Sequence, residues 1–268
     1  MKIWYNERLD NCINNLTLGI SVSGYVRTGP EWCGNNVCSP FSRLYLVDSG
    51  TGWLRTGEQV LFMEPGKAYL IPPGVRLDFG CENRLSKLYF HVNLLKPDRY
   101  DLLQSLNQIY CMELPAGWLE HIKKLQSSRT LFEALLLKQY LFQLITMFLV
   151  QTEITPEEIP VFSHHVSQAI DYTQRHLSAK LTVAELARQG FLSERHLSNL
   201  FRRELGVTPG QYLDDQLMLE AQRRLIQTTD GIGSISEALG FTDQFYFSRK
   251  FKKMHGQTPL QYRKNNRT

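Results

Sequence analysis

The sequence predicts an α+β protein of two domains, an amino-terminal β-domain with trailing helices and a carboxy-terminal all-α domain. Short apolar runs broken by Gly and Pro extend from position 42 to 93, a pattern typical of a β-sandwich or small barrel. After position 100, apolar residues recur at helical spacing. The carboxy-terminal part also contains an internal repeat. A chain of 268 residues suits about two domains, which we expect at 1–152 and 164–268 with a linker at 153–163.

The amino-terminal strands are predicted from β-branched and aromatic runs. They are Arg43–Val47, Trp53–Arg55, Ala68–Ile71 and Leu88–Val92. Turn signals separate them, including Glu64-Pro-Gly-Lys67 and Pro72-Pro-Gly74, since proline and glycine supply the backbone angles that tight turns require. The even spacing of strands and turns favours a closed or two-layered antiparallel fold.

The segments RLYLVDSGTGWL, MEPGKAYLIPPG and LYFHV together resemble a cupin-like β jelly roll. A metal-dependent cupin enzyme would need a cluster of histidines and a glutamate, whereas His91 is the only histidine between positions 42 and 93. An enzyme is therefore the weaker alternative for this domain. We expect no metal site, no catalytic residue and no cofactor.

A small-molecule pocket in the β-domain would be lined by alternate residues of its strands. Arg43 and Tyr45 share one strand face, and Tyr89 and His91 share a face of another strand. Two further aromatic residues suit stacking on a sugar or a planar ligand, namely Trp53 and Tyr69. The alternative is that these side chains belong to a filled core, and a register error of one residue would exchange the whole set.

Two helices are expected after the β-domain, at 100–110 and 131–152. The second is apolar almost all round, so it must be buried on several sides, and a homodimer is expected to supply part of that cover. A membrane span is disfavoured because Glu133, Lys138, Gln139 and Gln143 interrupt the apolar run.

The five cysteines form no CxxC pair, which favours reduced thiols in the cytoplasm. The first residues lack the apolar stretch of a signal peptide. We therefore expect a cytoplasmic protein.

The charge of the chain is unevenly divided. Residues 164–268 contain 15 Lys/Arg against 10 Asp/Glu, and residues 1–163 contain 15 against 16. The positive excess therefore lies wholly in the carboxy-terminal part, which favours a polyanionic partner for that part alone.

The internal repeat aligns His196–Tyr212 with Tyr246–Tyr262 at an offset of 50 positions. Each copy is preceded by a shorter predicted helix and a turn, at 182–192 and at 232–242. A short helix, a tight turn and a second helix with a polar outer face make a helix-turn-helix unit. The sequence thus predicts two such units, joined by a helix over Pro209–Gln227.

The outer face of each second helix carries groups that hydrogen-bond to base edges or phosphates. In the first unit these are Arg195, Ser198, Asn199 and Arg202. In the second unit they are Gln244, Phe245, Tyr246, Arg249 and Lys250. Four basic positions, with Arg202 among them, suit phosphate contacts that position the protein, namely Arg202, Arg203, Lys252 and Lys253. The alternative for all of these is a solvated polar face.

The segment ALGFTDQFYFSRKFKK, followed by GQTPLQYR, resembles the signature of the AraC/XylS (arabinose-regulator) family. The resemblance extends from His165 to Lys264 and implies seven helices with two helix-turn-helix units. It places base-reading residues at Arg195, Ser198 and Asn199, and at Gln244, Phe245, Tyr246 and Arg249. The family commonly has glycine where Phe191 stands, which puts the geometry of the first turn in doubt.

The sequence is therefore expected to encode a sequence-specific regulator that binds double-stranded promoter DNA, contacts RNA polymerase and senses a small-molecule effector, such as a sugar, in its β-domain. A ligand-independent regulator whose β-domain only dimerises is the main alternative.

Overall fold

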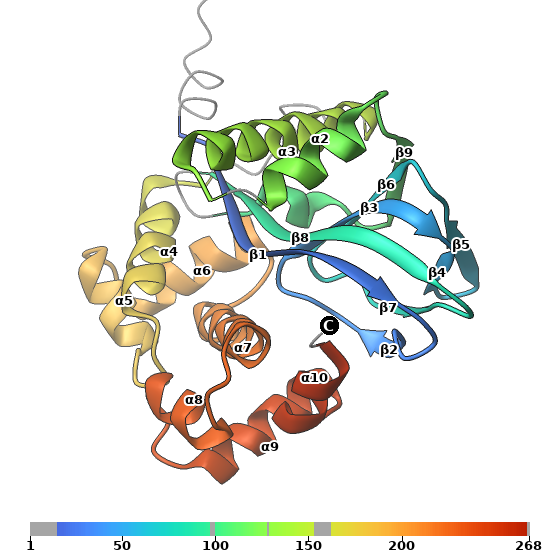
Figure 1. Cartoon of the computed structure of the whole chain (residues 1–268). Helices are drawn as coiled ribbons and strands as arrows, with labels where there is room; N and C mark the ends of the chain where they lie inside the picture. Colours follow the sequence, from blue (N-terminus) through green and yellow to red (C-terminus); the bar gives the residue numbers. More distant parts are fainter. Residues whose placement is uncertain (1–14, 97–99, 128, 153–161, 267–268) are drawn as a thin grey trace, which may run out of the picture. The chain divides into compact units, whose positions relative to one another are not determined.

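The computed structural model describes residues 15–96, 100–127, 129–152 and 162–266 (Figure 1). The chain forms two compact units that divide between positions 159 and 160. We call them the β-unit and the helical unit. The division falls within the linker expected at 153–163, of which positions 153–161 lie outside the described residues.

The β-unit contains two antiparallel sheets, a larger one with strand order β1-β8-β3-β6-β9 and a smaller one with order β2-β7-β4-β5. The larger sheet consists of β1 (Thr17–Thr28), β3 (Ser42–Gly50), β6 (Lys67–Ile71), β8 (Leu85–Leu95) and β9 (Tyr110–Glu113). The smaller sheet consists of β2 (Gly34–Val37), β4 (Gly52–Thr56), β5 (Gln59–Met63) and β7 (Leu77–Gly80). The expected jelly-roll-like β-domain is confirmed.

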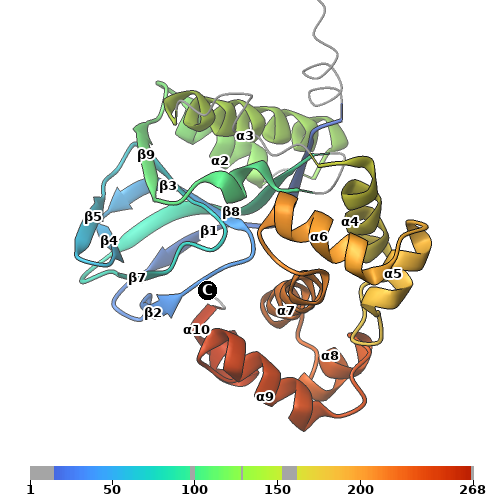
Figure 2. The same cartoon turned by 180° about the vertical axis from the view of Figure 1, so that it is seen from behind.

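Alternation along the strands of the larger sheet creates two separate cores. Leu44, Leu70 and Phe90 belong to a cluster that includes Leu141 and Phe148 of the helical cover. The intervening residues face the smaller sheet, in a cluster that includes Tyr45, Tyr69, Leu54 and Phe79. The β-unit is therefore built of three layers, smaller sheet, larger sheet and helices. In both views α2 (Trp118–Gln126) and α3 (Leu131–Gln151) cover one face of the larger sheet (Figure 2).

The helix expected over residues 100–110 is not formed. This segment contains the short 3-10 helix η1 (Leu102–Ser105) and ends at β9. Asp101 explains the difference, because its carboxylate accepts hydrogen bonds from the amides of Leu94 (3.0 Å) and Leu103 (3.1 Å) and from Asn93 Nδ2 (2.7 Å). These contacts fix the segment against β8 rather than leaving it free to continue as a helix.

The helical unit contains seven described helices, as the resemblance implied. They are α4 (His164–His176), α5 (Val183–Gln189), α6 (Glu194–Leu205), α7 (Pro209–Gln227), α8 (Ile232–Ala238), α9 (Gln244–His255) and α10 (Pro259–Asn266). The pairs α5–α6 and α8–α9 form the two helix-turn-helix units, and α7 connects them (Figure 1).

The repeated residues are those that begin, end and pack these helices. Gly206 and Gly256 end α6 and α9 in the left-handed conformation, with φ of 71° and 74°. The repeated Thr-Pro-x-Gln then starts the next helix. Thr208 Oγ1 accepts from the Gln211 amide while Gln211 Oε1 accepts from the Thr208 amide, at 3.2 and 2.9 Å, and the same pair of bonds recurs in the second copy. The repeat therefore encodes a capped scaffold.

The offset between the copies changes within the turn. Helices α5 and α8 lie 49 positions apart, whereas α6 and α9 lie 50 positions apart. The closing bonds of the turns, from the amide of Leu192 to Ala187 O and from Phe241 to Ser236 O, also keep the offset of 49. The second turn thus contains one additional residue, Thr242, before the next helix is capped by Asp243.

Candidate nucleic-acid interface and effector region

The second helix of the first unit, α6, presents a polar stripe to solvent. Ser193 caps it by accepting from the His196 amide at 3.2 Å. Its apolar stripe of Leu197, Leu200 and Phe201 is buried. Arg195, Asn199 and Arg202 are exposed on the other side, and Ser198 is half-buried. The four residues predicted for this unit therefore lie on the outer surface of one capped helix.

The turn before α6 is strained at Phe191. This residue has a φ of 53°, in the left-handed region that disfavours a side chain. The corresponding residue of the second unit is Gly240, with a φ of 81°. The phenyl ring of Phe191 is 96% exposed, so burial of the ring does not offset the strain.

The second helix of the second unit, α9, combines exposed aromatic and basic side chains. The Asp243 carboxylate caps it through the amides of Phe245 and Tyr246, both at 2.9 Å. Phe245 and Tyr246 are 72% and 51% exposed. Gln244 and Arg249 are also exposed, and Arg249 lies 3.9 Å from the Asp243 carboxylate. These four predicted residues share the outer surface of α9.

Lys250 differs from its neighbours on α9. Its ammonium group forms an ion pair with the Asp214 carboxylate of α7, and its side chain is only 20% exposed. Lys250 was predicted among the DNA-contacting residues, but in the structure it fastens α9 to α7. The sequence pattern missed this because Asp214 lies 36 positions away.

Further basic side chains lie in the last turns of α6 and α9, namely Arg202, Arg203, Lys252 and Lys253. All four are exposed. Arg203 donates to Glu204 at 2.7 Å, and Glu204 also accepts from the Ser163 amide at 2.8 Å. Although burial opposes it, these bonds hold the pKa of Glu204 below its ordinary value.

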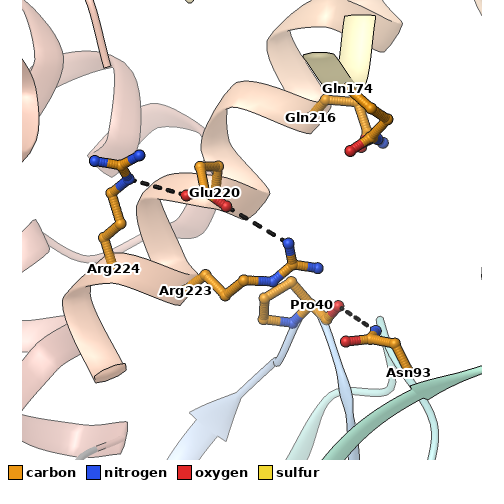
Figure 3. A network of polar contacts seen from close by, with 7 residues as sticks. All are labelled: Pro40, Asn93, Gln174, Gln216, Glu220, Arg223 and Arg224. Atoms are coloured by element: carbon orange, nitrogen blue, oxygen red, sulfur yellow. Dashed lines mark hydrogen bonds and ion pairs between the residues drawn. The ribbon is translucent and has the colours of Figure 1, made fainter. Parts of the chain in front are cut away.

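Helix α7 makes polar contacts within itself and with α4 (Figure 3). Glu220 accepts from Arg224 at 2.9 Å and from Arg223 at 3.5 Å. Gln216 of α7 accepts from Gln174 of α4 at 2.9 Å. Arg223 and Arg224 are thus partly neutralised, which leaves the cations of α6 and α9 as the stronger candidates for contact with a polyanion.

Five of the six predicted effector residues come from the larger sheet, on its face toward the smaller sheet. Arg43 pairs with His91 across β3 and β8, and Tyr45 lies beside both Tyr69 and Tyr89. All but the half-buried Tyr89 are at most 3% exposed. The structure thus brings these five residues together.

Most of these five side chains contact other parts of the β-unit. Arg43 donates to Ser39 Oγ at 2.9 Å and to Tyr45 Oη at 3.3 Å. Tyr69 Oη donates to Phe62 O at 3.1 Å and accepts from the Glu64 amide at 2.8 Å. Tyr69 is therefore held by the β5–β6 turn, as the filled-core alternative predicts.

Trp53 does not join this group. Its neighbour Leu54 faces the space between the sheets, so Trp53 lies on the outer face of the smaller sheet, where Arg55 lies 5.4 Å from its ring centre. The predicted pairing of Trp53 with Tyr69 around one ligand does not fit this geometry. Strand register, which the sequence left open, decides the outcome.

Lys87 is a member of the inner face that sequence reasoning missed. It lies two residues before Tyr89 on β8 and is 2% exposed. Its Nζ lies 3.4 Å from the centre of the Trp32 ring and 3.6 Å from that of Tyr45. Burial, reinforced by Arg43, lowers the pKa of Lys87 well below its usual range. The alternation that nominated Tyr89 and His91 also included Lys87.

His91 completes a basic group on the inner face. Its ring stacks on Phe41 with centres 4.2 Å apart, and its Nδ1 has no hydrogen-bond partner among the described residues. Burial, with the charges of Arg43 and Lys87, lowers the pKa of His91 to about 2. Among the described residues, no cluster of three His, Cys, Asp or Glu side chains is arranged to hold a metal ion.

Comparison with known proteins identifies the helical unit. A helix-turn-helix domain model matches residues 186–265. The chain is 35% identical over 105 residues to the arabinose operon regulatory protein of Escherichia coli, covering 39% of this chain and 36% of that one. It is 24% identical over 242 residues to the raffinose operon regulatory protein RafR of Pediococcus pentosaceus, covering 87% of each. The helical unit is therefore a helix-turn-helix domain of the AraC type.

Two further comparisons differ in how much of the other chain they cover. The transcriptional regulator YisR of Bacillus subtilis is 35% identical over 128 residues, and the chain spans 44% of it. ToxT of Vibrio cholerae has the same two-part fold, with a TM-score of 0.59 over 93% of this chain and 98% of ToxT. Since ToxT is only 11% identical, that likeness concerns the fold alone.

Proposed function

We propose that this protein regulates transcription by binding promoter DNA through α6 and α9 and by sensing a small molecule in its β-unit. The observation that carries the proposal is the pair of capped helices whose outer faces combine exposed Arg, Asn, Gln and aromatic side chains. Base edges in the major groove are read by these side-chain types.

Helices α6 and α9 carry different side chains at equivalent outward positions, so we expect them to read different base sequences. Arg195 of α6 corresponds to Phe245 of α9, and Asn199 corresponds to Arg249. Helix α7, with 19 residues, is about 28 Å long at 1.5 Å per residue. Since successive turns of the major groove lie about 34 Å apart, we infer an asymmetric site read from one side of the duplex.

The decisive experiment compares Arg249→Ala with Arg175→Ala on an operator selected by the wild type from randomised duplexes. The two side chains are matched, because they are 71% and 70% exposed and each lies beside an aspartate, but only Arg249 is on α9. We expect R249A to lose about 1–3 kcal/mol of binding free energy and to relax selectivity at one base pair. R175A should bind as the wild type does. Equal affinities and selectivities for all three proteins at one salt concentration would refute the assignment.

The β-unit is proposed to hold the effector. Relatives named for arabinose and raffinose operons favour a sugar, whereas one ToxT structure contains an unsaturated fatty acid. A thermal-shift screen across sugars and organic acids tests this, because a ligand of the native state raises the melting temperature. Failure of every compound would favour the ligand-independent alternative, which the packed space between the sheets also supports.

The homodimer is proposed to form through α3. Only Leu141, Leu144, Ile145 and Phe148 of this helix are buried, and a stripe of large apolar residues is left exposed. Its members are Leu131, Phe132, Leu135, Leu136, Phe142 and Val150. The length and composition of α3 would also suit a membrane span, but its buried residues pack on the larger sheet, which favours a protein partner for the exposed stripe.

Sedimentation of the wild type and of Leu135→Glu tests the dimer. We expect the variant to sediment as a folded monomer with a somewhat lower melting temperature, because it loses the stabilisation that a partner subunit gives the native state. A monomeric wild type at micromolar concentration would overturn the proposal. Contact with RNA polymerase belongs to the same proposed function, and transcription in vitro from the selected operator tests it.

A further inference from the structure

The space between the two sheets contains the ammonium group of Lys87, which forms no hydrogen bond with any described residue. Lys87 Nζ is fully buried and has no such partner. Its nearest neighbours are the faces of Trp32 and Tyr45. Aromatic faces attract a cation, but they do not replace the hydrogen bonds that water would provide.

The groups around Lys87 do not supply a counter-charge. The charges that act on it are those of Arg43, which repels it, and the Cys81 thiol. Those that act on His91 are again basic, Arg43 and Lys87. Lys67 and Lys123 of the same unit differ, because each has a carboxylate oxygen beside its ammonium group, from Glu64 at 2.9 Å and from Asp48 at 2.8 Å. The inner face is therefore basic and lacks an acid at Lys87.

Such an arrangement weakens the fold unless something else compensates for it. A buried cation without a partner costs stability, and residues that violate the rules of a stable core are concentrated at functional sites. An apolar side chain at position 87 would join the core cluster to which its neighbours Trp32 and Tyr45 belong without that cost. The retained ammonium group points to a ligand that brings negative charge.

Trp32 occupies the place over Lys87 and belongs to a loop. Its neighbours Glu31 and Cys33 are exposed, while its own side chain is 2% exposed and lies 4.5 Å from Phe79 between ring centres. On the outside, Gly29 and Glu31 of the same loop border a cavity of about 610 Å³. Withdrawal of this single side chain would open the inner face without unpairing a strand.

We propose that the effector is a small organic carboxylate, and that it binds between the sheets at Lys87 and Arg43 in the place that Trp32 fills in this structure. This inference rests on the proposed effector function of the β-unit and specifies its ligand class. A carboxylate suits both groups, because it accepts hydrogen bonds from an ammonium and from the fork of a guanidinium. Tyr45, which accepts from Arg43, lies between the two cations and orients the ligand.

The test uses pairs of compounds that share a skeleton but differ in charge: glucuronate with glucose, benzoate with benzyl alcohol, and octanoate with octanol. Unfolding of the full chain is followed by tryptophan fluorescence, which reports on the β-unit because all four tryptophans lie within the first 118 residues. At about ten times its Kd, a bound acid should raise Tm by about 3 °C or more, and its neutral partner should not.

Two variants separate binding from a structural role. Lys87→Met should abolish the response to the acid and should itself melt above the wild type, since it no longer buries an ammonium group. Lys67→Met, which removes a lysine of the same sheet that has acidic partners, should retain the response. If Lys87 had only a structural role, K87M would melt below the wild type and would still respond to the acid as the wild type does.

The proposal is overturned if no acid of the three pairs shifts Tm, if each neutral compound acts as well as its acid, or if K87M still responds. Operator binding is measured on the same preparations. If a neutral sugar stabilises the wild type, the proposed effector function is retained and the anionic site is rejected. If the wild type does not bind the operator, the proposed regulatory function itself is contradicted.

Discussion

His91 should make the stability of the β-unit depend on pH, and the size of the effect can be calculated. The imidazole is 3% exposed and stacks on Phe41. Burial and the charges of Arg43 and Lys87 lower its pKa to about 2, against an ordinary value of 6.5. The folded protein therefore keeps His91 neutral at pH 5, while the unfolded chain protonates it.

The stabilising effect of a neutral His91 is fully present above pH 6.5 and is lost as the pH falls from 6.5 toward 2, because only the unfolded state takes up the proton. Each pH unit below 6.5 costs about 1.4 kcal/mol. Between pH 7 and pH 5 the free energy of unfolding should thus fall by about 2 kcal/mol through this residue.

The assay is urea unfolding at pH 5, 6 and 7, followed by tryptophan fluorescence so that only the β-unit is observed. His91→Gln retains a polar side chain but does not titrate. Its free energy of unfolding should therefore fall by about 2 kcal/mol less than that of the wild type between pH 7 and 5. The difference between the two proteins removes the contributions of groups that titrate in both.

Parallel pH profiles for the two proteins would refute the reasoning, since they would mean that His91 accepts a proton within the folded β-unit. A steeper profile for H91Q would do so as well.

Three further outcomes are expected in the helical unit. Phe191→Gly should raise the free energy of unfolding by about 1 kcal/mol or less, because it relieves a left-handed residue but makes the unfolded chain more flexible; circular dichroism melts measure this, and Phe191→Ala should give no gain. Arg263→Ala should cost about 1.5–3 kcal/mol, since the guanidinium donates to Leu225 O at 3.1 Å and Asp230 O at 2.6 Å; an unchanged melt would contradict that estimate. Lys252→Ala should weaken binding to all duplexes similarly and lower the salt slope by about 1, as a titration at several salt concentrations would show, whereas a loss confined to the operator would assign it to base reading.

The helical unit was predictable because its signals are local. Apolar residues at helical spacing, Ser193 before α6 and Gly206 after it define a helix within 14 positions. The strands were harder. β1 was not predicted, although Leu18, Ile20 and Val22 alternate with glycine and serine, because no turn signal or long apolar run marks it and its order comes from pairing with β8, some 70 positions away.

In the candidate sites, too, features set by nearby residues were predicted, and features set by residues far away in the sequence were not. Exposure of Arg195 and Arg249 follows from helix periodicity alone. The side of the sheet on which Trp53 lies depends on β4 pairing with β5 and β7, and the role of Lys250 depends on an aspartate in another helix. Neither is contained in the sequence near the residue.

The two recognition helices are fastened to the rest of the helical unit by different forces. At the position of Lys250 in α9, the first copy has the buried Leu200 in α6. Dissolved ions screen a partly exposed ion pair and leave an apolar contact intact. Rising ionic strength should therefore loosen α9 before α6, and the half of the operator read by α9 should lose protection first. The slope of DNA affinity against salt concentration is used to count phosphate contacts. That count would then be too large, because screening of the ion pair between Lys250 and Asp214 would contribute to the slope.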